Sequence, residues 1–357
     1  MHAMKFAVGA LALGTALTLP LIGFALPKSP DHSRYNHPGN LLISDQFNNR
    51  VIETDKKGNI IWQFGLGPTD FSANSALGVN DAERVGDNTL MAATGIPAGV
   101  DSFCPSGCPD NRVMLVDQSG NILWQYGQFG VTGSGYDELN TPVQATYLPD
   151  NSVIITDQGN QRVIDVDQGL NIVWQYGTTG VAGNGFDQLN APNSAELLKN
   201  GDVLIADEGN NRVIEINPST LNVDATFTAQ GTMSGPAFAS LLPNKTILVS
   251  DGGNNRVIKV DNNDNVVFEY DTNTQSGSNP NPLPSRAIAG RGNDIVISDQ
   301  FNQRVIVIDQ KGNLLTQYGN LNAAGYGTSN TQQGLFAPYD AKVIGEYKGL
   351  TNPGNGH

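Results

Sequence analysis

Short apolar runs alternate with polar turns along most of the chain. From residue 142 the runs read "PVQATY", "SVIITD", "RVIDVD" and "IVWQYG", separated by turns rich in Asn, Asp, Gly and Pro. The runs are β-branched and apolar at successive positions, as in strands that are covered on both faces. This pattern predicts four short antiparallel strands, followed by the glycine-rich connection "TTGVAGNGFDQLNA".

The same unit occurs six times. In each copy an Arg-Val pair opens the third strand, and the six arginines are separated by 62, 50, 50, 44 and 48 residues: Arg50, Arg112, Arg162, Arg212, Arg256 and Arg304. Repeats of this length with four strands each are typical of propeller blades. The sequence therefore predicts an all-β fold, a six-bladed β-propeller of four-stranded antiparallel blades.

The two ends of the chain complement each other. The C-terminal "LFAPYDAKVIG" has the form of a first strand without successors, whereas the N-terminal "NLLISDQFNNRVIETDKKGNIIWQFG" has the form of the other three strands. We expect the C-terminal strand to pair with the N-terminal blade segment, which removes an open sheet edge.

The unit D-x-x-N-x-R-V-x-x-x-D-x-x-G, preceded by "G-x-G-x-x-x-L-N-x-P", resembles the NHL repeat over residues 40–345. That family includes enzymes, sensors and scaffolds, so the resemblance implies the fold rather than an activity. A residue needed in every copy supports the blade turn, and we assign this structural role to the aspartates five positions before the arginines: Asp45, Asp157, Asp207, Asp251 and Asp299. Trp62, Trp124 and Trp174 share one position in the fourth strand, where we expect packing between blades.

The termini differ from the repeats. Residues 1–25 have one lysine, a long apolar run and a small-x-small ending, which predicts a secretory signal peptide. A membrane anchor is the alternative, but the run is short for a span. We assign residues 26–39 to a linker, residues 40–346 to an NHL-like propeller and residues 347–357 to a flexible tail. The protein is then exported, to the periplasm, the cell surface or the medium.

The net charge of −14 at pH 7 argues against nucleic acid as a partner, since phosphate backbones would be repelled. No second apolar run is long enough to cross a bilayer.

One insertion interrupts the repeat. The segment "GIPAGVDSFCPSGCPDN" lengthens the second blade between its second and third strands and contains Cys104 and Cys108, the only cysteines. In an exported protein this pair predicts a disulfide, and Phe103 adjoins it. The spacing is unsuited to zinc or to a thioredoxin-type redox pair.

The first strand of each blade should line the central channel, yet the residues before its shared alanine do not repeat. They include acids, amides, an arginine and a tyrosine: Asn80, Asp81, Gln144, Asn193, Arg286, Tyr339 and Asp340. Such a set could bind a ligand at the channel mouth, or it could reflect a water-filled channel that tolerates change.

Aromatic residues also recur on the connections between blades, which should emerge on the same face as the insertion: Phe129, Tyr136, Phe186, Tyr326 and Phe336. Binding residues on rigid scaffolds usually lie on such loops. Together with Phe103, the aromatics Phe129, Tyr136 and Phe186 form the predicted binding surface.

The four histidines are His2, His32, His37 and His357, and none lies within a blade. Related propellers that act as amidating or antibiotic-inactivating lyases, quinoprotein dehydrogenases or arylsulfotransferases use histidines, so those activities are not expected. We therefore favour a non-catalytic module that binds a protein, a peptide or an extracellular polymer through the loop-rich face, without a cofactor or metal. The alternative is a calcium-dependent hydrolase or lactonase with a carboxylate site at the channel mouth.

Overall fold

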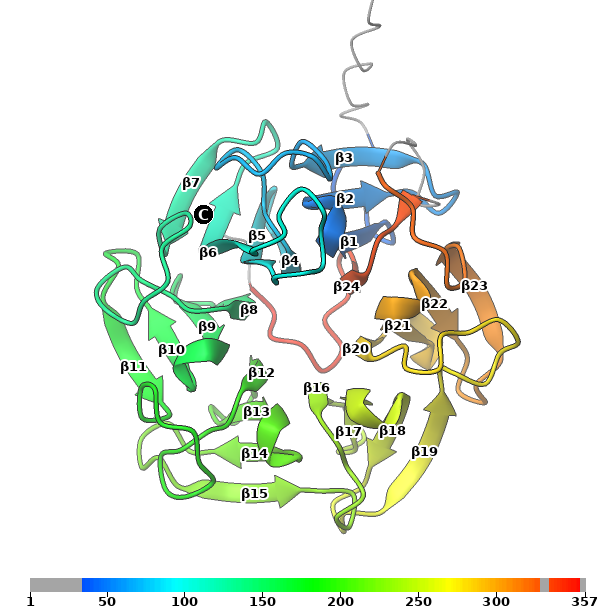
Figure 1. Ribbon diagram of the computed structural model, residues 1–357. Coiled ribbons are helices and arrows are strands. Elements are labelled where there is room, and N and C mark those ends of the chain that lie inside the picture. The colour runs from blue at the N-terminus through cyan, green and yellow to red at the C-terminus, as the bar shows by residue number, and fades with distance from the viewer. Residues whose placement is uncertain (1–33, 328–333, 354–357) are drawn as a thin grey trace, which may run out of the picture. The chain divides into compact units, whose positions relative to one another are not determined.

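Six four-stranded antiparallel sheets are arranged in a ring in the computed structural model of the protein, which describes residues 34–327 and 334–353 (Figure 1). All of these residues belong to the unit Asp31–His357. The finding confirms the predicted all-β, six-bladed propeller. Residues 1–33, which include the predicted signal peptide, lie outside the described residues. Within the described part, no helix is long and apolar enough to span a membrane.

The first three sheets run from the channel outward. Their strands are β24 (Pro338–Val343), β1 (Leu41–Asp45), β2 (Arg50–Thr54) and β3 (Ile60–Phe64); β4 (Val79–Val85), β5 (Asn88–Ile96), β6 (Cys108–Val116) and β7 (Ile122–Tyr126); and β8 (Pro142–Tyr147), β9 (Val153–Asp157), β10 (Arg162–Val166) and β11 (Ile172–Tyr176).

The other three sheets repeat this order. Their strands are β12 (Pro192–Leu197), β13 (Val203–Asp207), β14 (Arg212–Ile216) and β15 (Val223–Phe227); β16 (Pro236–Leu241), β17 (Ile247–Asp251), β18 (Arg256–Val260) and β19 (Val266–Asp271); and β20 (Pro284–Ala289), β21 (Ile295–Asp299), β22 (Arg304–Ile308) and β23 (Leu314–Gly319). In the first sheet, β24 pairs antiparallel with β1, with Ala341 opposite Ile43.

One-turn 3-10 helices join the second and third strands in five blades. They are η1 (Gln46–Asn48), η2 (Gln158–Asn160), η3 (Glu208–Asn210), η4 (Gly252–Asn254) and η6 (Gln300–Asn302); a sixth, η5 (Arg291–Asn293), joins β20 to β21. Each of the five ends at a residue in the left-handed conformation, Asn49, Gln161, Asn211, Asn255 or Gln303. Asn and related polar residues tolerate this conformation, which explains their recurrence there.

The repeated Asp and Arg residues form buried ion pairs at these turns. Asp157, for example, accepts hydrogen bonds from Arg162 Nε at 2.8 Å and from the backbone N–H of Asn140 at 2.8 Å, which ties the turn to the incoming connection. In the blade with the insertion, Asp110 takes this role beside Arg112. The structural role predicted for the repeated aspartates is confirmed.

Apolar cores lie between neighbouring blades. Trp62 packs with Met91 and Met114 of the next blade, and its indole N–H donates to Gln118 O at 2.9 Å. Trp174 makes the equivalent bond to Pro218 O at 3.0 Å, and Trp124 is buried among residues of two blades. The predicted inter-blade packing of the tryptophans is confirmed.

The C-terminal segment differs from the expected flexible tail over residues 347–353. It crosses the middle of the ring in Figure 1, on the side where the first strands end. Tyr347 donates to Arg84 O at 3.3 Å, Lys348 to Gly290 O at 3.0 Å, and Thr351 to the Glu196 carboxylate at 2.8 Å. Three separate blades therefore anchor this segment, because unpaired groups at their strand ends find partners on it. Residues 354–357 lie outside the described residues.

Candidate functional site

The innermost strands β4, β8, β12, β16, β20 and β24 line the channel, and each is irregular at its second residue. In all six blades the register of its pairing with the next strand shifts by one residue at this position. In β12, for example, Pro192 and Ser194 pair with successive residues of β13, and Asn193 between them has no partner in the register. Such a bulge turns two successive residues toward one side of a sheet. It explains why two neighbouring positions, such as Asn193 and Ser194, both depart from the repeat.

All seven residues predicted for the channel mouth are buried, and the most exposed, Tyr339, is only 9% exposed. Arg286 reaches across the channel: Nη1 donates to Asn193 Oδ1 at 3.1 Å and to Ala237 O at 3.0 Å, and Nη2 donates to Val143 O at 3.2 Å. Its guanidinium also lies 5.0 Å from the Tyr339 ring centroid. Arg286 thus links several blades rather than facing an open mouth.

The loop-side end of the channel holds an amide network. Asn80 Oδ1 accepts from Gln46 Nε2 at 2.7 Å, and Gln46 Oε1 accepts from Gln300 Nε2 at 2.8 Å. Asn193 Nδ2 donates to Glu208 Oε2 at 2.7 Å. Burial raises the pKa of Glu208 above its usual value. Beside this network lies a small cavity of about 140 Å³, lined in part by Asn193, Glu208 and Tyr339.

The other end of the channel holds an acid cluster around one lysine. Lys342 Nζ lies 2.6 Å from Asp81 Oδ1 and 2.7 Å from Asp340 Oδ2. Burial raises the pKa of Asp340 to about 6, that of Glu196 to about 7 and that of Glu83 well above its usual range. Gln144 bridges the cluster by donating to Glu196 Oε1 at 2.9 Å.

The structure adds Glu83, Glu196 and Lys342 to the residues named from the sequence. They follow Asp81, Ser194 and Asp340 by two positions on the same strands. Side chains two positions apart lie on the same face of a strand. The sequence could therefore have identified these three residues as channel-lining from their spacing to the predicted ones. Among the described residues, no group of three or more His, Cys, Asp or Glu side chains is arranged to hold a metal ion.

The loop face consists of the five turns η1–η4 and η6, the connections between blades and the insertion of residues 97–107. The turns and connections lie together because they share backbone hydrogen bonds, such as Gly159 N–H to Asn140 O at 2.9 Å and Phe47 N–H to Phe336 O at 3.1 Å. The insertion joins β5 to β6 at the same end of its blade. The predicted aromatic positions on this face are strongly exposed at Phe103 (72%), Tyr136 (70%) and Phe186 (70%). Phe129 differs, since its half-buried ring packs 4.7 Å from the Arg112 guanidinium.

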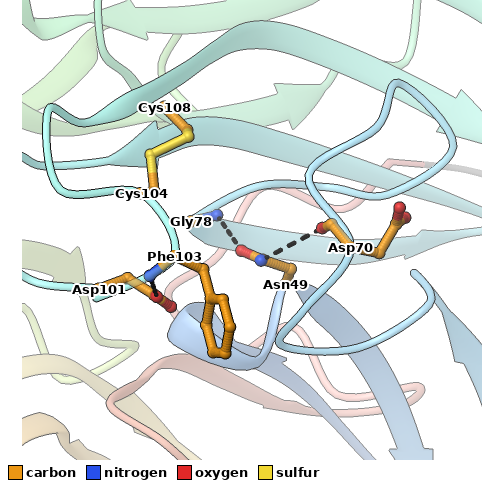
Figure 2. The surroundings of a disulfide bond; sticks show 7 residues. All are labelled: Asn49, Asp70, Gly78, Asp101, Phe103, Cys104 and Cys108. Atoms are coloured by element: carbon orange, nitrogen blue, oxygen red, sulfur yellow. Dashed lines mark hydrogen bonds between the residues drawn. A yellow bond between two sulfur atoms is a disulfide. The ribbon is translucent and has the colours of Figure 1, made fainter.

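The insertion is held in place by its own bonds. Cys104 and Cys108 form the predicted disulfide, with their Cα atoms 5.9 Å apart. The Phe103 N–H donates to Asp101 Oδ1 at 2.7 Å, and the Cys104 N–H donates to Asp101 O at 3.1 Å. Figure 2 shows Phe103 next to the bridge, with its ring directed away from the sulfur atoms. The insertion therefore presents an ordered exposed aromatic.

One sector of the loop face is more apolar than the rest. The second residue of the one-turn helix is Gly159, Gly209 or Gly253 in three blades, but Phe47 in η1 and Phe301 in η6. Phe47 packs with Ile96, Phe71, Phe301 and Phe336, and Tyr326 meets the Phe336 ring at 5.5 Å. We call this set, together with Phe103 on the neighbouring insertion, the aromatic sector. The prediction from sequence missed Phe47 and Phe301, although both stand where other copies have glycine.

No protein-family model matches the chain, and no curated protein matches its sequence. Solved structures do resemble it. A protein of unknown function from Bacteroides caccae is 15% identical with a TM-score of 0.59, over 87% of this chain and 100% of that one. A streptogramin B lyase structure is 14% identical with a TM-score of 0.52, over 82% of this chain and 81% of that one. At these identities the likeness shows the six-bladed propeller fold alone.

Proposed function

We propose that the protein is an exported, non-catalytic propeller of the NHL-repeat type that binds a protein, peptide or surface-polymer partner through its loop face. The observation behind this proposal is the ordered exposure of aromatic side chains there, above all Phe103 beside its disulfide. Large rigid aromatics are common anchors of protein interfaces. A loop that is ordered before binding also loses less conformational entropy when the partner arrives.

The channel supports the same conclusion. Its polar groups mostly bond to one another, and the Lys342 ammonium lies between Asp81 and Asp340, where a divalent cation would have to lie in the calcium-dependent alternative. A ligand or metal there would have to displace these bonds. The propeller segment, residues 40–346, also lacks histidine as a general base, which speaks against lyase chemistry.

The test compares variants of the loop face. Tagged wild-type protein and the Phe103→Ser variant would capture partners from the native envelope fraction, and binding to the purified partner would then be measured by surface plasmon resonance. We expect affinity to fall by about tenfold or more in the variant, as for an interface anchor. Leu123→Ser, at an exposed apolar position on the outer strand β7, is the matched control and should bind normally. Equal binding by Phe103→Ser, Tyr136→Ser and Phe186→Ser would refute the assignment of this face.

A further inference from the structure

A cavity of about 810 Å³ opens on the face opposite the loop face, between two neighbouring blades. Its walls are the turn after β12 and the turn after β16, and residues 347–350 of the C-terminal segment form its third side. The volume falls within the range of about 300–1,000 Å³ that small-molecule sites occupy. The cavity is separate from the aromatic sector and from the acid cluster.

The cavity is apolar inside. Its lining includes Leu197, Leu198, Leu241, Leu242 and Leu350, of which Leu198 and Leu242 are each only 8% exposed. Leu197, Leu241 and Leu350, by contrast, are half-buried and leave apolar surface in contact with water, and a ligand with a hydrocarbon portion would remove that contact. The shape and lining therefore favour a ligand with an aliphatic body.

The rim is basic. Lys199, Lys245 and Lys348 all line the cavity, and none of the described residues that line it is acidic, although the chain has a net charge of −14. Lys348 is engaged with Gly290 O and Asn293 Oδ1 at 3.0 and 3.2 Å. Lys199 and Lys245 are exposed and form no ion pair with any residue that the structure describes. The carboxylate of the same turn, Asp202, accepts a hydrogen bond from Asn200. Two ammonium groups thus remain available to an anion.

These lysines are not part of the repeat. The turn after the first strand reads "LPDNS" at residues 148–152, "LKNGD" at 198–202 and "LPNKT" at 242–246. The first copy has the acid Asp150 where the other two have neutral residues next to a lysine. Among these three turns, lysine occurs only in the two that line the cavity, so the lysines are a local feature rather than a requirement of the repeated fold.

We propose that this cavity is a binding site for a long-chain carboxylate, with the hydrocarbon chain against the leucines and the carboxylate between Lys199 and Lys245. The lysine stems extend the apolar wall while their ammonium groups stay at the rim. The ligand needs both the hydrocarbon chain and the carboxylate. A neutral chain would leave the lysines without a counter-charge, and a small anion would leave the apolar surface of the leucines in contact with water. Thr351, bonded to Glu196, fixes the segment that forms the third wall.

The test measures the binding of laurate to the full mature chain by isothermal titration calorimetry. Dodecanol, which has the same chain length but no charge, is the neutral probe. We expect laurate to bind and dodecanol to bind at least about fivefold more weakly, since an exposed charge pair has a modest effect. Lys199→Gln/Lys245→Gln should weaken laurate binding by about five- to thirtyfold, and Leu350→Asp should weaken it at least as much.

Two variants serve as controls: Lys311→Gln, on the turn before β23, and Leu66→Asp, at a position that is 70% exposed and lies outside the cavity. Both should bind laurate as wild type does. The proposal is overturned if laurate does not bind, if dodecanol binds equally well, or if the lysine double variant and Leu350→Asp both retain wild-type affinity. It is also overturned if phosphatidylglycerol vesicles sediment with the protein while free laurate shows no binding. Phe103→Ser should leave laurate binding intact, so this result is independent of the loop-face test.

Discussion

Lys342 and Asp81 lie 261 positions apart in the sequence, yet their side chains meet in the buried channel with Nζ 2.6 Å from Oδ1. Lys342 also contacts Asp340 and donates to Ala82 O at 3.1 Å. The ammonium is therefore shared between β24 and β4, two neighbouring inner strands. Because Glu83 and Glu196 lie in the same cluster, Lys342 is the cation that offsets several buried acids.

Removal of this cation should strongly destabilise the propeller. In Lys342→Met the volume is roughly kept, but Asp81 and Asp340 remain buried without a cation. Breaking a buried ion pair in this way typically costs about 3–5 kcal/mol. The free energy of unfolding from urea titrations gives the measurement, and Lys311→Met, on the exposed turn before β23, should change it by less than about 0.5 kcal/mol. A loss below about 1 kcal/mol for Lys342→Met would show that the cluster does not depend on the ammonium.

The same geometry makes a prediction about calcium. Because Lys342 lies between the two carboxylates, adding Ca²⁺ in excess should not raise the melting temperature of the wild-type protein. A ligand that binds the folded state at a hundredfold its dissociation constant would add about 2.7 kcal/mol, which a thermal scan detects. Calcium-dependent stabilisation that disappears in Asp81→Asn or Asp340→Asn, together with lactone hydrolysis, would favour the hydrolase alternative.

The fold followed from the sequence because each blade is specified locally. Each of the six copies has an Asp near its Arg, β-branched runs and turn residues, and each copy forms the same four-stranded sheet. The insertion and its disulfide were also predictable, since they are deviations from a known period. These features depend on residues that are close together in the chain.

The site was only partly predictable because its contacts join distant blades. The seven channel residues were found as breaks in the repeat, but the sequence did not show that Arg286 crosses the channel or that Lys342 neutralises Asp81. The docking of Thr351 on Glu196 was missed because residues 347–353 match no repeat unit. Such contacts arise only when the ring is assembled, so neither strand periodicity nor turn chemistry encodes them.

The repeated ion pairs offer an internal comparison of buried and partly exposed charges. Arg304 and Arg212 each donate from Nε to their aspartate at 2.7 Å, but Arg304 is 1% exposed and Arg212 is 14% exposed. Both aspartates are fully buried, so the two pairs differ in the arginine. Arg304→Met should therefore destabilise the protein more than Arg212→Met, because water beside the more exposed Arg212 can reach its aspartate once the guanidinium is removed. Urea unfolding of the two variants gives the comparison directly. Equal losses would mean that burial at these turns does not set the strength of the pair.

The pairing of β24 with β1 makes a prediction about truncation. A chain ending at Gly334 lacks β24, so β1 would lose its partner from Leu41 to Asp45 and expose an unpaired edge. We expect a large fall in melting temperature or loss of cooperative unfolding. A chain ending at Pro353, which retains β24 and the Thr351 contact, is the control and should unfold like the full chain. Wild-type stability of the shorter chain would refute the predicted closure by the two ends.

Glu196 should make part of the stability depend on pH. Burial raises the pKa of Glu196 from its usual 4.5 to about 7, so the folded protein binds this proton more tightly than the unfolded chain does. Its contribution is therefore fully present below about pH 4.5 and is lost as the pH rises to about 7. The exposed turn carboxylates Asp117 and Asp167 have pKa values that are lowered by hydrogen bonds from Asn121 and Asn171. Their contribution to stability has the opposite pH dependence, because it is lost as the pH falls. The prediction thus concerns a difference between variants rather than the whole pH profile.

In Glu196→Gln the amide imitates the protonated acid, and its oxygen still accepts a hydrogen bond from Thr351. The free energy of unfolding should be compared with wild type at about pH 5 and about pH 8, because titrating groups remote from the channel contribute equally to both proteins. Glu83 is the exception, since the charge of Glu196 helps to raise its pKa, and the loss of that charge in the variant acts in the same direction. The variant should gain stability relative to wild type as the pH rises, by at most about 1.4 kcal/mol for each unit by which the pKa is raised. Thr351→Val tests the partner: it removes a hydrogen bond to the carboxylate, so it should cost more at the higher pH, where Glu196 is ionised. A difference between Glu196→Gln and wild type that stays constant across this range would show that the pKa of Glu196 is not raised into it, and the predicted contribution of Glu196 to the pH dependence would be wrong.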